Sequence, residues 1–181
     1  ELNGQPLTLN SGAPLRLIVP GWYGVAQVKF LNHIHAQENR FVGKYMSRDY
    51  VTLRSRENGP DTEWIEYTVG PIQLKSVVTR VTKLGNTTKI MGFALTDLTP
   101  LKSVEVSIDG GPWQAAKLDA QNTKTSWKLF SYTWNGATPG EHTIVSRATD
   151  TRGNIQPEKA DPTKKTIWEN PEQMPRRVMI S

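Results

Sequence analysis

Two cations flank a glycine-bearing loop near the start of the chain. Arg16 lies within residues 14–20, and Lys29 follows the loop that begins at Pro20 and Gly21. A guanidinium can clamp a phosphate through two parallel hydrogen bonds, whereas an ammonium acts as a point charge. Backbone N–H groups of a glycine loop add further donors for an anion. These residue types at this spacing predict a binding corner for a phosphate or another oxyanion.

The residues around these cations have the pattern of short strands. Residues 15–19 alternate in character between Pro14 and Pro20, neither of which can donate to a sheet ladder. An apolar pattern resumes over residues 28–34. We therefore expect a strand, a loop and a second strand. An ordinary hairpin with a solvated arginine is the alternative.

The middle of the chain has the character of an all-β domain. Six runs with strand patterning are separated by turn residues: 75–82, 89–95, 103–108, 113–118, 126–134 and 141–149. Asp109, Gly110 and Gly111 predict a tight hairpin turn, because glycine accepts positive φ. Gly92 within a strand indicates a bulge or a close packing contact. This spacing predicts an immunoglobulin-like antiparallel β-sandwich, in a chain that is mainly β.

Composition narrows the choice of partners. The chain has 181 residues, no cysteine and a net charge of +5, so disulfides are excluded. Lysine and arginine are mixed with acidic residues, which favours a solvated surface over a nucleic-acid patch. No apolar run approaches the length that crosses a bilayer, so we expect no membrane partner. An oxyanion substrate or a pyrophosphate cofactor would suit this charge.

The histidines and loop aspartates do not form a recognisable metal site. His33 and His35 are two apart and share one face of an extended segment. No third ligand of suitable type lies near them, and zinc sites need three or four. Asp109 and Asp150 lack the converging oxygens that calcium requires. We expect no metal ligand within this chain.

Three motifs occur in order in the first part of the chain: NGQPL at residues 3–7, PLRLIVPG at 14–21 and VKFL at 28–31. Further motifs follow in the β-rich part, where VEVSIDGG spans residues 104–111 and WQAAKL spans 113–118. Together they resemble the sulfite oxidase family of molybdenum oxidoreductases, and the resemblance extends over essentially the whole chain.

The resemblance implies a division into three parts. Residues 1–53 would be the C-terminal part of a mixed α+β molybdopterin-binding domain, with one helical turn before a strand at 50–53. Residues 54–73 read as a polar linker with one anchoring tryptophan. Residues 74–181 would be the immunoglobulin-like dimerisation domain with an irregular extended tail.

The resemblance also implies site residues. Those expected to hold the molybdopterin cofactor are Ser11, Arg16, Gln27, Val28 and Lys29. Tyr50 is the expected catalytic residue, because the segment 48–50 resembles the one that brings a tyrosine to the substrate. A phenol can donate a hydrogen bond to an oxyanion. A core tyrosine is the alternative.

The implied whole protein is an enzyme that passes two electrons from sulfite or a related oxyanion to molybdenum and then to a haem or cytochrome. The family's molybdenum ligand is a cysteine from an earlier part of the domain. We therefore expect the ligand outside this chain, which would be a truncated or cleaved piece and inactive alone. A homodimer and a periplasmic location are also expected.

Two departures from the family pattern bear on the substrate. Ser11 stands where the vertebrate pattern has histidine. The family's tail arginine is missing, because the matching place reads Trp168, Glu169, Asn170 and Pro171. This absence weakens sulfite as the expected substrate.

Two other function classes stay open. A non-enzymatic β-sandwich binding module would use Trp22, Tyr23 and Trp113 as an aromatic platform. A basic nucleic-acid binder would show salt-dependent retention on DNA.

Overall fold

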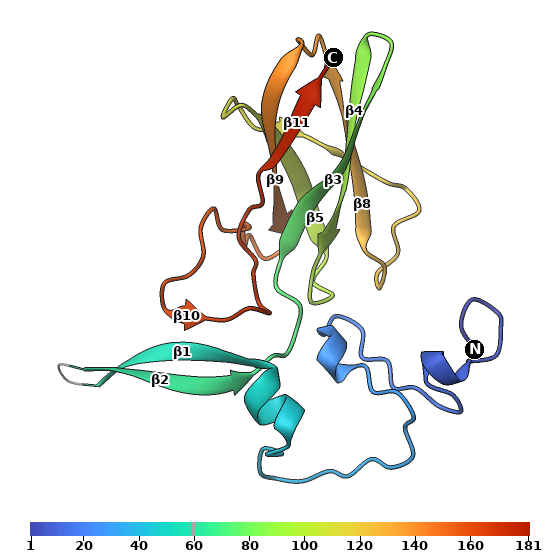
Figure 1. Ribbon diagram of the computed structural model, residues 1–181, viewed down its shortest axis with the longest axis vertical. Helices are drawn as coiled ribbons and strands as arrows, with labels where there is room; N and C mark the ends of the chain where they lie inside the picture. Colours follow the sequence, from blue (N-terminus) through green and yellow to red (C-terminus); the bar gives the residue numbers. More distant parts are fainter. Residues whose placement is uncertain (59–60) are drawn as a thin grey trace. The chain divides into compact units, whose positions relative to one another are not determined.

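The computed structural model describes residues 1–58 and 61–181 (Figure 1). The chain forms two compact units. Unit 1 comprises Glu1–Ile72 together with Asp161–Glu169, and unit 2 comprises Gln73–Ala160 together with Asn170–Ser181. The chain therefore enters unit 2, returns to unit 1 over residues 161–169, and ends in unit 2. We call residues 161–169 the return segment.

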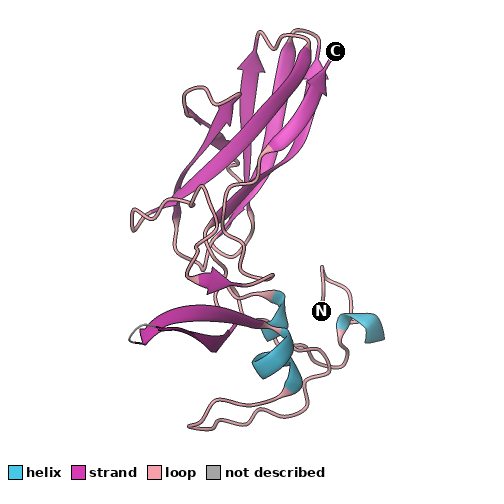
Figure 2. Ribbon diagram, turned by 60° about the vertical axis from the view of Figure 1, so that its left-hand side comes forward, coloured by secondary structure: helices cyan, strands magenta, loops and turns pink. Residues whose placement is uncertain are grey.

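Unit 2 is an antiparallel β-sandwich, as the strand spacing predicts. One four-stranded sheet has the order β11-β9-β5-β6 and the other has the order β3-β4-β8-β7. The strands are β3 (Lys75–Leu84), β4 (Thr87–Leu95), β5 (Leu101–Ile108), β6 (Gln114–Ala115), β7 (Lys117–Leu118), β8 (Lys128–Asn135), β9 (Gly140–Asp150) and β11 (Arg176–Ile180). Figure 2 shows how strands dominate this unit.

The core of unit 2 comes from alternate residues of facing strands. The buried apolar residues are Val78, Ile90, Ala94, Val104, Val106, Phe130, Ile144 and Ala148. Because side chains of a strand point alternately to opposite faces, one face of each sheet fills the core. Val104, Val106 and the partly buried Ile108 thus share the core-facing side of β5.

Glycines occupy two demanding backbone positions in this unit. Asp109 and Gly110 have φ of 51° and 71°, which is the left-handed geometry of a tight hairpin turn. A Cβ on Gly92 would lie 2.1 Å from the Val77 carbonyl oxygen and 2.5 Å from the Phe130 ring. The register of β3 against β4 shifts nearby, between Val78 and Arg80. The predicted turn and close packing contact are both confirmed.

A buried amide joins β3 of one sheet to β9 of the other. Gln156 is 1% exposed, and its Oε1 accepts from Ser76 N at 2.8 Å and from Ala148 N at 3.2 Å. Ser76 belongs to β3 and Ala148 to β9, which lie in different sheets. The Gln156 side chain therefore accepts hydrogen bonds from both β3 and β9, which cannot pair with each other because they lie in different sheets.

Two predictions about the sandwich need correction. Residues 113–118 form two separate pairs, because β6 pairs with β5 whereas β7 pairs with β8. The tail is not wholly irregular, since β11 pairs with β9 from Arg176 opposite Ile144 to Ile180 opposite Gly140. The prolines of the tail all precede Arg176, so residues 176–180 keep every N–H that a ladder needs.

Unit 1 contains a three-stranded sheet and three short helical turns. The sheet has the order β10-β1-β2, with β1 (Val51–Asn58), β2 (Asp61–Thr68) and β10 (Lys164–Lys165). The turns are η1 (Leu9–Ser11), η2 (Gly24–Ala26) and the π-helix η3 (Tyr45–Asp49). The helical turn expected before residue 50 is present.

Most of the segment expected as a linker is instead a hairpin. β1 pairs with β2 from Val51 opposite Thr68 to Asn58 opposite Asp61. Its charged side chains can pair across the strands, as Arg56 Nη2 does with Glu63 Oε2 at 2.7 Å. Cross-strand pairing of polar residues explains why a polar segment is ordered here.

The segments expected as strands at residues 15–19 and 28–34 are extended but form no regular ladder. Two backbone hydrogen bonds join them, Leu17 N to Val28 O and Leu31 N to Leu15 O, both at 2.9 Å. Phe30 has a φ of 56°, which breaks strand geometry between the two bonds. The prediction of two strands is therefore wrong, although the two segments do lie side by side.

Within residues 1–58 and 61–181, no helix is long and apolar enough to cross a lipid bilayer.

Candidate functional site

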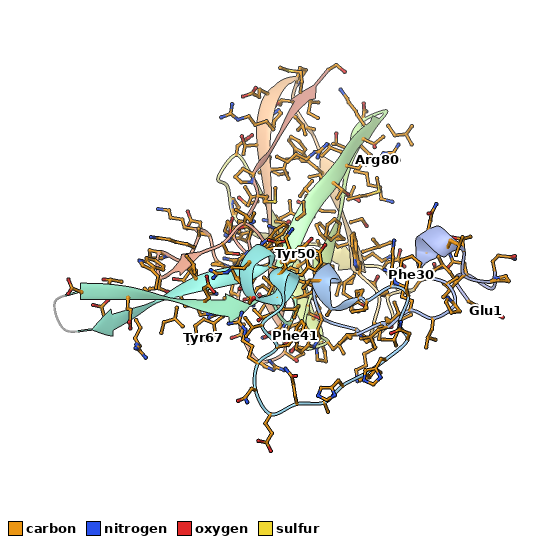
Figure 3. All side chains as sticks on the ribbon, turned by 60° about the horizontal axis from the view of Figure 1, so that its bottom comes forward. Glu1, Phe30, Phe41, Tyr50, Tyr67 and Arg80 are labelled. Atoms are coloured by element: carbon orange, nitrogen blue, oxygen red, sulfur yellow. The ribbon has the colours of Figure 1, made fainter. Side chains whose placement is uncertain are left out.

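Unit 1 contains a pocket of about 1140 Å³ that brings together distant parts of the chain. It is lined by the segment 23–30, by Phe41 and the segment 43–46, by Tyr50 and Val69, and by Trp168 of the return segment. In Figure 3, the labels Phe30, Phe41 and Tyr50 mark three of these contributions. Of the predicted site residues, the pocket gathers Gln27, Val28, Lys29 and Tyr50.

Gln27 shapes the loop through its side chain. Its Oε1 accepts from Val19 N at 2.8 Å, and its Nε2 donates to Val19 O at 2.9 Å. The amide thus imitates a strand residue where Pro20 cannot donate. These two bonds fix the segment that carries Val28 and Lys29 against the one that carries Arg16.

Lys29 is held against the η1 turn. Its Nζ donates to Asn10 O at 2.6 Å. Gly12 has a φ of 101°, and a Cβ on it would lie 3.0 Å from Lys29 Cβ. Glycine is therefore needed for the two segments to approach this closely. An ammonium has three donors, so Lys29 retains donors for an anion.

Ser11 and Arg16 do not line the pocket. The Ser11 hydroxyl lies 3.0 Å from Thr8 Oγ1, which also accepts from Ser11 N at 3.2 Å. Arg16 is half-buried, and its Nε is buried without a hydrogen-bond partner among the residues that the structure describes. A buried donor left unpaired costs about 1–3 kcal/mol, and more when the group is charged. Arg16 therefore carries a donor suited to an additional acceptor.

Tyr50 forms the aromatic wall of the pocket together with two residues that the sequence reasoning missed. Its ring centroid lies 4.6 Å from the indole of Trp168 and 6.3 Å from the ring of Tyr45. Trp168 Nε1 also donates to Asp49 O at 2.8 Å. Tyr50 is half-buried and lines the pocket, and its phenol O–H can donate a hydrogen bond to an anion.

The missed lining also includes a cation, Lys44, among aromatic and apolar residues. Lys44 lies with its Nζ 5.9 Å from the Tyr45 ring centroid. Lys44 and Tyr45 belong to the segment that precedes the predicted tyrosine, so its mixture of basic and aromatic residues was a usable signal. Nothing in the local sequence around Trp168 links it to a pocket, because its partners lie more than a hundred residues earlier.

Comparison with known proteins identifies the part of the chain that forms this site. Residues 1–45 match the model of the oxidoreductase molybdopterin binding domain. Human mitochondrial sulfite oxidase is 30% identical over 186 residues, covering 93% of this chain and 32% of the human protein. Sulfite oxidase from Arabidopsis thaliana is 26% identical and covers 93% of this chain.

The chain belongs to the sulfite oxidase family.

A solved structure agrees with this family assignment over both units. The sulfane dehydrogenase SoxCD from Paracoccus pantotrophus has a TM-score of 0.78 at 25% identity, covering 93% of this chain and 44% of that one. Relatives in the sulfite oxidase family are longer, since the chain spans 32% of the human enzyme and 46% of the Arabidopsis enzyme.

Proposed function

We propose that this chain is the C-terminal part of a molybdenum cofactor-dependent oxidoreductase that acts on sulfite or a related oxyanion. Unit 1 would supply one wall of the molybdopterin pocket, and unit 2 would supply a dimer contact. The observation that carries this proposal is the unit 1 pocket, which joins the molybdopterin-domain segment 23–30 to Tyr50 and Trp168.

The residues around the pocket suit an anionic cofactor. The unpaired buried Nε of Arg16 would reach a partner if a phosphate oxygen lay beside it. Lys29 would add a point charge from the adjoining segment, and Val28 and Gln27 would shape the wall between them. Ser11 would contribute through the η1 turn that holds Lys29. When bound, molybdopterin would supply a metal centre that accepts the two electrons.

Tyr50 would hold the substrate rather than the cofactor. Its ring forms the pocket wall with Trp168, so a phenol O–H at this place can donate to an oxyanion. The same wall restricts water on one side of the substrate. Lys44 would raise the local positive potential.

Unit 1 has exposed apolar side chains that another part of the same protein would cover. They include Val42 at 80%, Ile34 at 74% and Phe41 at 65% of their full area. Covering them would be favourable, because it removes apolar area from water. We infer that the molybdenum-ligating cysteine and the rest of the pterin pocket lie in an N-terminal portion outside this chain. This chain alone would then be inactive.

The remaining partners follow from the family. The complete protein would form a two-fold homodimer through unit 2 and pass electrons to a haem or cytochrome acceptor, in the periplasm. No nucleic acid or membrane partner is included in this proposal.

The test uses the complete protein that contains this chain. Molybdenum and pterin are measured per polypeptide, together with sulfite-dependent reduction of ferricyanide. Arg16→Gln should lower cofactor content about tenfold, because a charge-assisted hydrogen bond to a phosphate is worth about 1.5–3 kcal/mol. Arg56→Gln is the matched control, since the Arg56 side chain is 65% exposed and pairs with Glu63 on the neighbouring strand.

Three results would contradict the proposal. The first is a complete wild-type protein that carries no molybdenum. The second is equal cofactor loss in the Arg16 and Arg56 variants. Stoichiometric molybdenum on residues 1–181 alone would refute the placement of the metal ligand outside this chain.

A further inference from the structure

The return segment contacts β1 at several points. β10 pairs with β1, with Lys165 opposite Leu53 and Lys164 opposite Arg54. Ser55 N donates to Thr163 O at 2.8 Å. The segment ends in Trp168 and Glu169, and both of these side chains reach the region where β1 begins.

Glu169 is a buried carboxylate at the end of this segment. It is 5% exposed, and its Oε2 accepts from the Thr52 hydroxyl at 2.7 Å. Arg54 Nη2 lies 3.8 Å from the same oxygen, but the Arg54 side chain is 42% exposed. Burying a charge is costly unless it is hydrogen-bonded and paired. Thr52, which is 1% exposed, is therefore the close partner of this carboxylate.

The hydroxyls of Thr52 and Thr166 form a hydrogen-bond network with Glu169. A hydroxyl has one proton and an ionised carboxylate only accepts, so the Thr52 proton belongs to Glu169. The 3.1 Å contact between the two hydroxyl oxygens then uses the proton of Thr166. Thr166 Oγ1 in turn accepts from Trp168 N at 3.0 Å and from Glu169 N at 3.2 Å. The Thr166 hydroxyl thus holds the backbone of Trp168 and Glu169. The Thr52 hydroxyl holds the Glu169 carboxylate and also contacts Thr166.

Two contacts lie side by side at this point. Tyr50 ends the η3 turn, and Thr52 is the second residue of β1, so the two lie only two residues apart in the chain. Glu169 contacts Thr52, whereas its neighbour Trp168 contacts the ring of Tyr50 with a centroid separation of 4.6 Å. Trp168 and Tyr50 both line the pocket. A change at the Glu169–Thr52 contact would therefore act directly beside the Trp168–Tyr50 contact in the pocket wall.

We propose that Glu169 is a positioning residue, which through Thr52 sets the place of the Trp168 indole against Tyr50 in the substrate pocket. This inference rests on the proposed function of that pocket. Glu169 touches neither the pocket nor a substrate, and it acts through Trp168. The tail is thereby a determinant of substrate affinity, although none of its charged side chains lines the pocket.

The test compares variants of the complete protein. Thr52→Val removes the hydroxyl at nearly constant shape, Thr52→Ser retains it, and Glu169→Gln removes the charge. We expect Thr52→Val and Glu169→Gln to raise KM for sulfite about three- to tenfold, with kcat within about twofold of wild type. Thr52→Ser should restore wild-type KM. Glu158→Gln, at an exposed site in unit 2, is the matched control.

Hydrogen exchange gives a second readout that does not need turnover. Thr52→Val should speed amide exchange in residues 161–169 and in residues 45–52, and Thr52→Ser and Glu158→Gln should leave both segments unchanged. Faster exchange together with an unchanged KM would overturn the positioning role and leave Glu169 a structural residue. Unchanged exchange at residues 45–52 would also overturn it. A wild-type protein without molybdenum or sulfite turnover would refute the proposed function instead. The exchange data separate the two failures, because they do not depend on turnover.

Discussion

Replacing Gln156 by leucine removes the amide that joins the two sheets of unit 2 while keeping most of the side-chain volume. In the native protein, Oε1 accepts from Ser76 N and Ala148 N, and from Ser76 Oγ at 2.7 Å. Nε2 donates to Ser76 O and to Glu172 O, both at 3.3 Å. Leucine can replace none of these bonds.

The expected cost follows from the groups left without partners. Ser76 Oγ keeps the Ser146 hydroxyl at 3.0 Å, and the carbonyl oxygens lose only long contacts. The two buried amide N–H groups lose their acceptor outright, and each such group costs about 1–3 kcal/mol. Gln156→Leu should therefore lower the free energy of unfolding by about 3 kcal/mol. For a chain of this size, that corresponds to a fall in Tm of about 6–12 °C.

The assay combines thermal unfolding with residue-resolved hydrogen exchange in the intact protein. Exchange should accelerate first at the amides of Ser76 and Ala148, because these two lose their acceptor. Gln114→Leu, at an exposed position of β6, is the control and should change Tm little. A fall in Tm of less than about 2 °C for Gln156→Leu, or unchanged exchange at both amides, would refute the sheet-joining role of this glutamine.

Two further predictions concern unit 2 and its turns. Gly92→Ala should destabilise the protein by about 2–4 kcal/mol, because the new Cβ would lie 2.1 Å from the Val77 carbonyl oxygen. Gly24→Ala is the control, since a Cβ there meets no atom within 4 Å. Equal melting temperatures for the two variants would contradict this prediction. The hydrogen bond between His142 Nδ1 and Asp109 Oδ2, at 2.6 Å, raises the pKa of His142 above its ordinary 6.5 and lowers that of Asp109 below 3.8. Because the pKa of His142 is raised in the folded state, its contribution to stability is complete below pH 6.5 and is lost as the pH rises through the raised pKa. Tm should thus exceed that of His142→Gln by more at about pH 5.5 than at about pH 9, and parallel curves would contradict it.

The local patterns that predicted the sandwich correctly depend on backbone sterics. Gly92 interrupts an apolar strand, and only glycine fits where the Val77 carbonyl approaches so closely. The hairpin turn was predictable from Asp109 and Gly110 because positive φ restricts residue choice. In contrast, β11 could not be predicted, since its residues gain strand structure only by pairing with β9.

In unit 1 the predictions of local geometry failed where a single residue departs from the pattern. The apolar spacing of residues 28–34 indicates a strand, but Phe30 adopts a φ of 56°. The side-chain amide of Gln27 bonds Val19 N and Val19 O in place of a strand backbone, and a hydrophobic periodicity does not predict such side-chain bonds. The motif containing Lys29 nevertheless lines the unit 1 pocket, because its position there does not depend on strand geometry.

The role of the tail depends on contacts that sequence reading cannot see. Trp168 Nε1 donates to Asp49 O, 119 residues earlier in the chain. The family pattern has an arginine in the tail, whereas the matching place here reads Trp168, Glu169, Asn170 and Pro171. The structure places this carboxylate on Thr52, beneath the aromatic wall of the pocket. A residue that does not bind an oxyanion would still affect how the pocket binds one, because it would set the place of the Trp168 indole against Tyr50.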